Sequence, residues 1–300
     1  MKNKFAVYIA AIITVILWGM SYIWSDRLLA LNIPVEFFLP IRILLAAILL
    51  FVYNLLTKKD MRLNKKTFYK FIILALCMPF IYFFAETYGL QFTESPTITS
   101  LIIATNPIFS MLVGMLLFKE HFSAMNIAGV FITLAGLWLV TYTHTETGPM
   151  FAIGIVVLFI AVVAEVSQLA FTKSLSAHFA PSVIVMYQFL FGTVFFLPLF
   201  LTKGLASFDA SLYFSWDVIY PTISLAVLCG AGAFTLWAFA IKHLGVAKIS
   251  VFLAIVPLAT ALLSFFVGDE RLCLLQWCGL AIGMVGIYMT QVLSKKHKAQ

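Results

Sequence analysis

The sequence contains very little charge. Asp, Glu, Lys and Arg make up only 10% of its 300 residues, whereas soluble globular proteins carry roughly 25%. Apolar residues account for 63% of the chain, and the mean hydropathy is +1.06. This balance excludes a soluble globular protein. The loops between the apolar segments are also very short, which excludes a sizeable domain outside the membrane.

Cysteine is scarce, and the motifs of common catalytic sites are missing. The four cysteines, at positions 77, 229, 273 and 278, have neither a CxxC nor a metal-binding spacing. We therefore expect small hydrophobic side chains rather than a disulfide framework. The sequence has no P-loop, HExxH, nucleophile elbow or glycine-rich dinucleotide motif. We expect no catalytic residues, no metal site, no cofactor and no drive by ATP.

Positive charge is concentrated in loops and tails, although the net charge is +7. With the N-terminus placed in the cytoplasm, fifteen Lys and Arg fall on the cytoplasmic side, three fall on the other side, and Arg42 lies within an apolar segment. The asymmetry follows the positive-inside rule and explains the basic residues without nucleic acid as a partner. It predicts a bacterial-type inner membrane protein with both termini in the cytoplasm.

Ten apolar segments are long enough to cross a bilayer, which needs about 20 residues per helix. The first follows Lys2 and Lys4 and has 21 uncharged residues without a cleavage pattern. We therefore interpret it as a helix and not as a signal peptide. The predicted fold class is an all-α integral membrane protein with ten transmembrane helices, at approximately 5–28, 34–57, 68–91, 95–118, 123–143, 149–173, 181–202, 217–241, 246–268 and 272–293.

The fourth and ninth segments carry the same pattern of small residues on one helix face. Pro96–Val140 and Val246–Thr290 share eight identities in 45 positions, most of them small, proline, acidic or glycine residues. The pattern is Ser100, Ala104, Pro107, Ser110 and Gly114, and 150 positions later Ser250, Ala254, Pro257, Thr260 and Ser264.

This repeat predicts two five-helix units, residues 1–146 and 147–300. Because five is odd, the second unit enters the membrane from the opposite side, so the repeats are inverted. Inverted repeats around a site at the bilayer midplane, with helices interrupted by proline or glycine, are typical of secondary transporters. The pattern therefore favours transport.

Several short motifs recur in a definite order and spacing: Trp18-Gly19, Arg42, Gly89–Thr93, and the run Pro107, Glu120, Gly129, Gly136 with its echo Pro257, Glu270, Gln276, Gly279, Gly286. Together these motifs resemble the drug/metabolite transporter superfamily, specifically its EamA-type members. The resemblance spans the whole chain and implies ten helices, cytoplasmic termini and movement of small metabolites, often outward. The second half departs from the pattern, since Phe189 stands where Arg42 stands in the first half.

Glu86 and Arg42 are expected at a similar depth, near the outer ends of the third and second segments. An ionisable group at the centre of a bilayer costs roughly 2.5–3.5 kcal/mol, and less near the ends. Glu86 should therefore face a partner or a wet cavity. One interpretation makes Glu86 a proton-coupling residue or a site for a substrate's ammonium group. The other makes it the partner of Arg42 in a structural ion pair.

Glu165 is the stronger candidate for proton coupling. It lies well inside the sixth segment, with no Lys or Arg at comparable depth. A desolvated carboxyl group favours its protonated form, as a proton carrier requires. Gln168 follows one turn later and is expected to share its cavity. The structural alternative is a glutamate that bonds to a polar group of a neighbouring helix.

Asn106-Pro107 and Pro257 are expected to interrupt the fourth and ninth helices, because proline removes a backbone donor and leaves a carbonyl unpaired. Such carbonyls are tolerated at membrane depth where they line a cavity or find polar neighbours. We predict that both prolines act as hinges and that Asn106, Ser100 and Ser250 contact substrate. The alternative is close helix packing through the small residues.

Among the aromatic residues, Trp18 and Tyr22 lie one turn apart on the first helix, and Trp237 lies in the eighth. A cavity lined by these rings would suit amphipathic or aromatic metabolites, including cations held over a ring face. Glu120 and Glu270 follow the fourth and ninth segments. We expect each to complement the start of the next helix, with a secondary role in a gate.

The sequence thus predicts a secondary active transporter, with export favoured, of small organic metabolites such as amino acids or related amphipathic compounds. It would work by alternating access around a midplane cavity and would be coupled to protons. We expect a monomer in the lipid bilayer. The alternatives are a membrane receptor or scaffold that does not transport, and an integral membrane enzyme, which would need clustered His, Asp or Cys at one interface.

Overall fold

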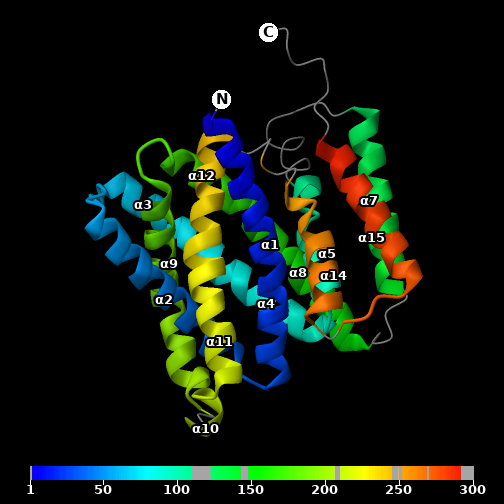
Figure 1. Cartoon of the computed structure of the whole chain (residues 1–300), viewed down its shortest axis with the longest axis horizontal. Helices are drawn as coiled ribbons and strands as arrows, with labels where there is room; N and C mark the ends of the chain where they lie inside the picture. The colour runs from blue at the N-terminus through cyan, green and yellow to red at the C-terminus, as the bar shows by residue number, and fades with distance from the viewer. Residues whose placement is uncertain are drawn as a thin grey trace.

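The computed structural model describes residues 2–109, 123–142, 148–206, 210–244, 249, 252–268 and 270–291. Every regular element in these ranges is a helix (Figure 1). The elements are α1 Lys2–Ala30, α2 Val35–Leu56, α3 Lys65–Ala75, α4 Tyr82–Thr93, α5 Pro96–Ile103, α7 Ala124–Tyr142, α8 Pro149–Leu175, α9 Pro181–Leu199, α10 Ala210–Tyr213, α11 Trp216–Ser224, α12 Phe234–Leu244, α14 Val256–Phe266 and α15 Leu274–Gln291.

Seven helices in the described part are long and apolar enough to cross a membrane, and three more apolar helices are shorter. The chain is therefore an all-helical integral membrane protein, as predicted. The shorter three are Pro96–Phe109, Val256–Phe266 and Leu274–Thr290. Parts of the predicted fourth and ninth spans lie outside the described residues. Ser110, Gly114, Glu120 and Ser250 are among the residues outside them.

Local sequence explains where several helices begin. Pro96, Pro149 and Pro181 each occupy the first turn, where a missing backbone N–H breaks no helical bond. The side chain of Asn64 accepts a hydrogen bond from the backbone N–H of Thr67 at 2.9 Å and begins α3. Such caps stabilise a helix by about 1 kcal/mol.

Wider, π-helical turns occur inside two of the long predicted helices. Leu76–Ile81 joins α3 to α4 and contains Pro79, and Met78 has non-helical dihedral angles. Leu225–Ala233 joins α11 to α12. These turns place irregular backbone in the middle of the bundle, where π-turns often accompany functional sites.

The predicted interruptions before the two prolines are present. A turn at residues 104–105 precedes Asn106-Pro107, and a turn at residues 254–255 precedes Val256-Pro257. Pro257 stands in the first turn of α14, so it begins a second helical piece instead of breaking a continuous hydrogen-bond ladder.

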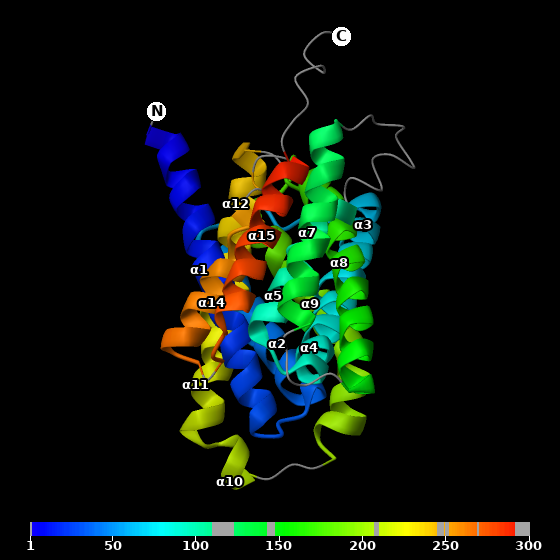
Figure 2. The same ribbon diagram turned by 90° about the vertical axis from the view of Figure 1, so that its right-hand side faces the viewer.

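The helices form a bundle in which partners come from distant parts of the chain (Figures 1 and 2). The most extensive contacts join α7 with α15, α4 with α8, and α2 with α9. Helix α1 packs between α14 and the helix formed by α11 and α12. Helix α1 begins and α15 ends at the same end of the bundle.

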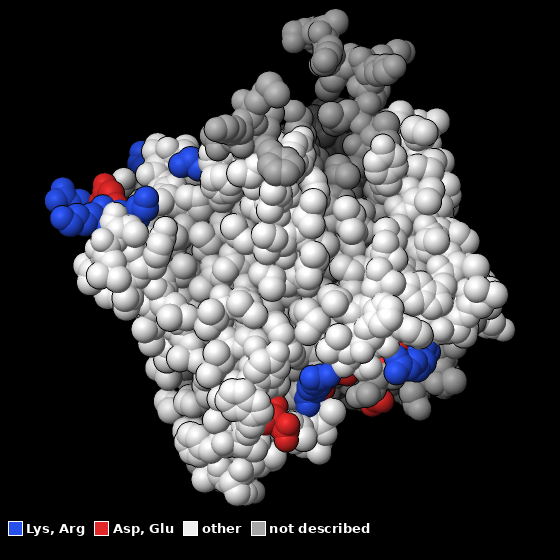
Figure 3. Space-filling model, viewed as in Figure 1, with Lys and Arg blue, Asp and Glu red and all other residues white. Residues whose placement is uncertain are grey.

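Charge is confined to the two ends of the face shown in Figure 3, and the broad middle is uncharged. Large apolar side chains such as Ile12, Phe131 and Val156 are exposed. An apolar band between two charged ends matches the profile of a lipid bilayer.

Helices α7 and α15 approach so closely that their backbones touch. A methyl group built on Gly136 would lie 2.6 Å from the carbonyl oxygen of Gly279, and one built on Gly129 would lie 2.8 Å from that of Gly286. Small residues at such crossings let van der Waals packing replace the hydrophobic effect, which does not operate between helices in lipid. The glycines therefore hold α7 against α15.

We predict that Gly136→Ala destabilises the protein by about 1–3 kcal/mol, because the added methyl group overpacks this crossing. Thermal unfolding of the purified protein in detergent measures the effect. Gly148→Ala is the matched control, since a methyl group there meets nothing within 4 Å. Equal melting temperatures for the two variants would contradict this account of the crossing.

Candidate functional site

A cavity of ≈ 750 Å³, including the space at its mouth, lies in the middle of the bundle. Its walls come from α1, α2, α4, α5, α8, α9, α12 and α14, and from the two π-helical turns described above. Aromatic residues form much of the wall: Trp18, Tyr22, Tyr82, Phe83, Phe189 and Phe234. The polar lining residues are Ser21, Arg42, Glu86, Ser100, Glu165 and Gln168.

Seven of the residues singled out in the sequence line this cavity, although they come from five helices. These are Trp18, Tyr22, Arg42, Glu86, Ser100, Glu165 and Gln168. Asn106 lies within hydrogen-bonding reach of the Glu165 carboxyl group. Trp237 packs behind Trp18, with ring centroids 5.0 Å apart. Pro107 and Pro257 adjoin the helix turns described above, and Ser250 is outside the described residues.

Glu86 is held by tyrosines. The hydroxyl of Tyr82 donates a hydrogen bond of 2.7 Å to Oε1 of Glu86, and the hydroxyl of Tyr22 lies within reach of the same carboxyl group. Tyr82 precedes Glu86 by one helical turn, so both side chains lie on one face of α4. Tyr22 comes from α1, and this contact therefore joins two helices across the cavity.

Arg42 lies close to Glu86 without touching it. Its guanidinium carbon is 4.1 Å from the centre of the Phe83 ring, a cation–π contact. The charges of Arg42 and Glu86 interact, yet among the described residues no nitrogen of Arg42 comes within 4.0 Å of a Glu86 oxygen. The two side chains therefore do not form the direct ion pair that one interpretation predicted, although their charges interact.

Glu165 is buried inside the bundle. Its side chain is only 4% exposed, so it faces the interior and not lipid. Its charge interacts with that of Glu86, and its Oε2 has no hydrogen-bond partner in the part of the chain that the structure describes. Gln168 also lines the cavity, but its Oε1 accepts a hydrogen bond from Thr172 at 3.0 Å.

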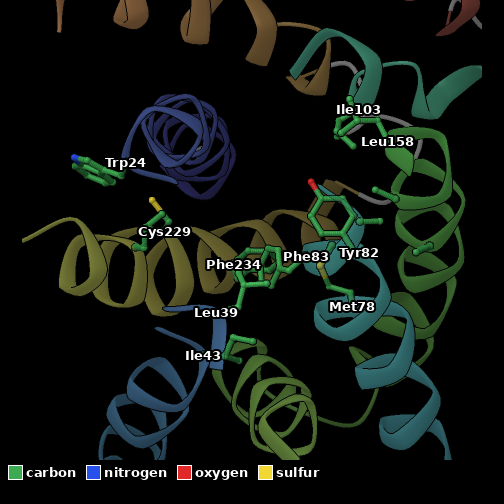
Figure 4. Close-up of a cluster of buried hydrophobic side chains, with 14 of the residues drawn as sticks. Trp24, Leu39, Ile43, Met78, Tyr82, Phe83, Ile103, Leu158, Cys229 and Phe234 are labelled. Atoms are coloured by element: carbon green, nitrogen blue, oxygen red, sulfur yellow. The ribbon is translucent and has the colours of Figure 1, made fainter. Parts of the chain in front are cut away.

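Several aromatic rings of the cavity wall pack against one another. Phe83, Phe189 and Phe234 form a triangle with ring centroids 5.3–6.3 Å apart. Phe83 and Phe234 lie beside Tyr82 in Figure 4. Trp18 joins this group through Phe234 at 5.3 Å. The indole nitrogens of Trp18 and Trp237 are buried with no hydrogen-bond partner among the described residues.

Sequence reasoning missed Tyr82, Phe83, Phe234 and Cys229 as cavity residues. Tyr82 had a usable signal, because it stands four residues before Glu86 on the same helix. The phenylalanines had none, since the chain contains 30 of them and most pack in the core or against lipid.

Glu270 contacts a different helix from the one we expected. It binds the start of α5 and not that of α15. Its carboxylate accepts hydrogen bonds from the Ser95 hydroxyl, from the Thr97 hydroxyl at 2.6 Å and from the Thr97 backbone N–H at 3.1 Å. Gln276 instead serves the start of α15, where its side chain accepts from the Cys273 N–H at 2.8 Å. A carboxylate at a helix N-terminus is favoured by the helix dipole.

A family model described as the EamA-like transporter family matches this chain twice, over residues 5–142 and 152–292. The chain belongs to the EamA-like transporter family. It is thus a membrane transporter by family, with a small-molecule substrate and a lipid environment, and the family points away from an enzyme.

Individual relatives agree with this assignment. The "Uncharacterized transporter YetK" of Bacillus subtilis is 24% identical over 99% of this chain and 90% of its own length. A "Probable terminal-alkyne amino-acid exporter" of Streptantibioticus cattleyicolor is 29% identical over 67% of this chain and 66% of its own length. A solved crystal structure matches 97% of this chain and 98% of its own with a TM-score of 0.71 at 13% identity, which shows a shared fold.

We predict that Tyr82→Phe destabilises the protein by about 1–3 kcal/mol, because a buried carboxylate loses a hydrogen-bond donor. Unfolding of the purified variant by heat in detergent reports the change. Tyr69→Phe is the control, since Tyr69 is 66% exposed and its loss should leave stability unaltered. A Tyr82 variant as stable as the control would show that Glu86 does not depend on this hydroxyl.

Proposed function

We propose that this protein is a secondary active transporter that exports small organic metabolites, such as amino acids or related amphipathic compounds. Two inverted five-helix units, residues 1–146 and 147–300, would alternately open a central cavity to each side of a bacterial inner membrane. Both termini would lie in the cytoplasm, where the positive-inside rule puts the lysine-rich loops. The name of the Streptantibioticus relative supports an amino-acid-like substrate and the outward direction.

Several features recur about 150 residues apart and support the inverted repeat. The turns at 104–105 and 254–255 correspond, and so do the π-helical turns Leu76–Ile81 and Leu225–Ala233. The glycine contacts are also related in pairs. Exchanging Gly129 with Gly279 and Gly136 with Gly286 converts the 129–286 contact into the 136–279 contact, as a two-fold axis requires. The family model matches each half separately.

The observation that carries the proposal is a buried cavity, built from both halves, that contains a carboxyl group with an unpartnered oxygen. Ionisable groups inside a membrane mark substrate and proton pathways because they are expensive to bury. Among the described residues no lysine or arginine acts on Glu165, so its carboxyl group can exchange a proton or receive a substrate's ammonium group. The interrupted helices α5 and α14 would be the moving walls, with Pro107 and Pro257 as hinges.

A receptor or scaffold without transport is the alternative, and cysteine accessibility distinguishes the two. In a variant without the four native cysteines, we expect Ala104→Cys, on the cavity wall, to react with water-soluble maleimides from either side of the membrane. Transported solutes should change its labelling rate. The same test applies to Ala254→Cys, and Gly148→Cys is a surface control. Labelling that never responds to any solute would contradict alternating access.

We predict that Glu165→Gln folds normally but loses proton-driven transport, because the amide cannot carry a proton. Solute flux into proteoliposomes, with and without a pH gradient, measures the coupling. Glu94→Gln removes an exposed carboxylate outside the cavity and should transport like the native protein. Flux through the Glu165 variant with unchanged dependence on the gradient would assign coupling elsewhere.

A further inference from the structure

Arg42 is the one arginine on the cavity wall within the described part of the chain, and its donors are unused. The residue is only 6% exposed, and no hydrogen bond or ion pair joins its guanidinium group to any described residue. A guanidinium group offers five N–H donors in a fixed fork. Burying such a group without partners is costly, so an arginine left this way needs a partner that the chain itself does not supply.

The surroundings of Arg42 fix its position but leave its donors open. The guanidinium carbon lies over the face of the Phe83 ring, 4.1 Å from its centre, and a phenyl ring has no lone pair to accept the N–H donors. Phe83 is itself held in the triangle with Phe189 and Phe234. The edge of the guanidinium group, which carries the N–H donors, is therefore the part available to a ligand.

Glu86 is the nearest candidate partner, and it does not close the pair. Tyr82 already donates to its Oε1, and Tyr22 lies within reach of the same carboxyl group. The two charges interact across a gap wider than 4.0 Å inside the central cavity. Two opposite charges that do not touch each other can bind a small ligand that carries both a negative and a positive group.

We propose that Arg42 and Glu86 bind the head group of a compact zwitterion, with its carboxylate on Arg42 and its ammonium group on Glu86. A carboxylate matches the guanidinium fork in shape and charge. The apolar remainder of the ligand would lie against Phe83, Phe189 and Phe234. The proposal rests on the transport function above and adds to it a binding subsite separate from Glu165, which stays available for the proton.

The test uses the purified protein in detergent with four ligands, L-leucine, L-methionine, L-phenylalanine and L-tryptophan, each beside its carboxamide. A ligand that binds only the folded state raises the melting temperature, and titration gives its affinity. We expect an L-amino acid to bind and its carboxamide, which lacks the negative charge, to bind about ten- to a hundredfold more weakly. We expect Arg42→Gln to weaken amino-acid binding by a similar factor and to remove the preference over the amide.

Two further variants keep the test independent of folding. Arg42→Lys retains the charge but not the fork, and it should bind with intermediate affinity. Arg27→Gln removes an arginine that instead donates to the Val267 carbonyl, away from the cavity, and should bind like the native protein. Should both Arg42 variants fail to fold, the comparison of acid with amide on the native protein decides.

Equal binding of amino acids and amides, or unaltered binding by Arg42→Gln, would overturn the subsite. Failure of all four amino acids to bind the native protein would overturn it as well. Neither result affects the proposed transport function, which is decided by solute-dependent labelling at position 104. Conversely, zwitterion binding that needs Arg42, without any change in labelling, would support the subsite and reject transport.

Discussion

The cost of burying charge in a medium of low dielectric constant governs the centre of this protein. Three ionisable side chains, Arg42, Glu86 and Glu165, lie inside a bundle whose outer surface is apolar. Each would be expelled or neutralised unless the fold supplied a partner or a polar space. The aromatic wall, the tyrosine hydroxyls and the irregular backbone near the cavity all reduce that cost. The residues around the cavity therefore stabilise these three ionisable groups inside the bundle.

The periphery meets a different requirement, since helices in lipid cannot rely on the hydrophobic effect to associate. Glycines at 129, 136, 279 and 286 bring α7 and α15 into backbone contact. The helices around the cavity are instead interrupted, by turns in the α5 and α14 regions and by the two π-helical segments. The molecule thus combines a closely packed helix pair, α7 and α15, with helices of irregular backbone around the cavity.

Sequence patterns predicted the helical class, the approximate spans and seven of the cavity residues, because an apolar stretch and a buried charge are strong local signals. Ser100 was accessible through the repeated pattern of small residues, and Gln168 through its place one turn after Glu165. The π-helical turns and the Phe83–Phe189–Phe234 triangle were not, since neither is encoded by spacing alone. The partner of Glu270 was predicted wrongly for the same reason. Chain adjacency suggested α15, whereas tertiary packing brings the start of α5 to the carboxylate.

The two cavity carboxylates differ in what surrounds them, and we propose that this difference gives them separate roles. Glu86 has a tyrosine donor, a second tyrosine within reach and an arginine as an electrostatic neighbour. Its position is thus fixed by three groups from three helices. Glu165 has Asn106 within reach and one oxygen without a partner among the described residues.

A carboxylate held in a fixed position suits ligand recognition, which depends on geometry. A carboxylate with fewer partners suits exchange of a proton, because it is free to gain and lose a partner. Because the two charges also repel, a ligand's ammonium group beside Glu86 would lower the cost of ionising Glu165, and binding and proton release would be linked through this repulsion.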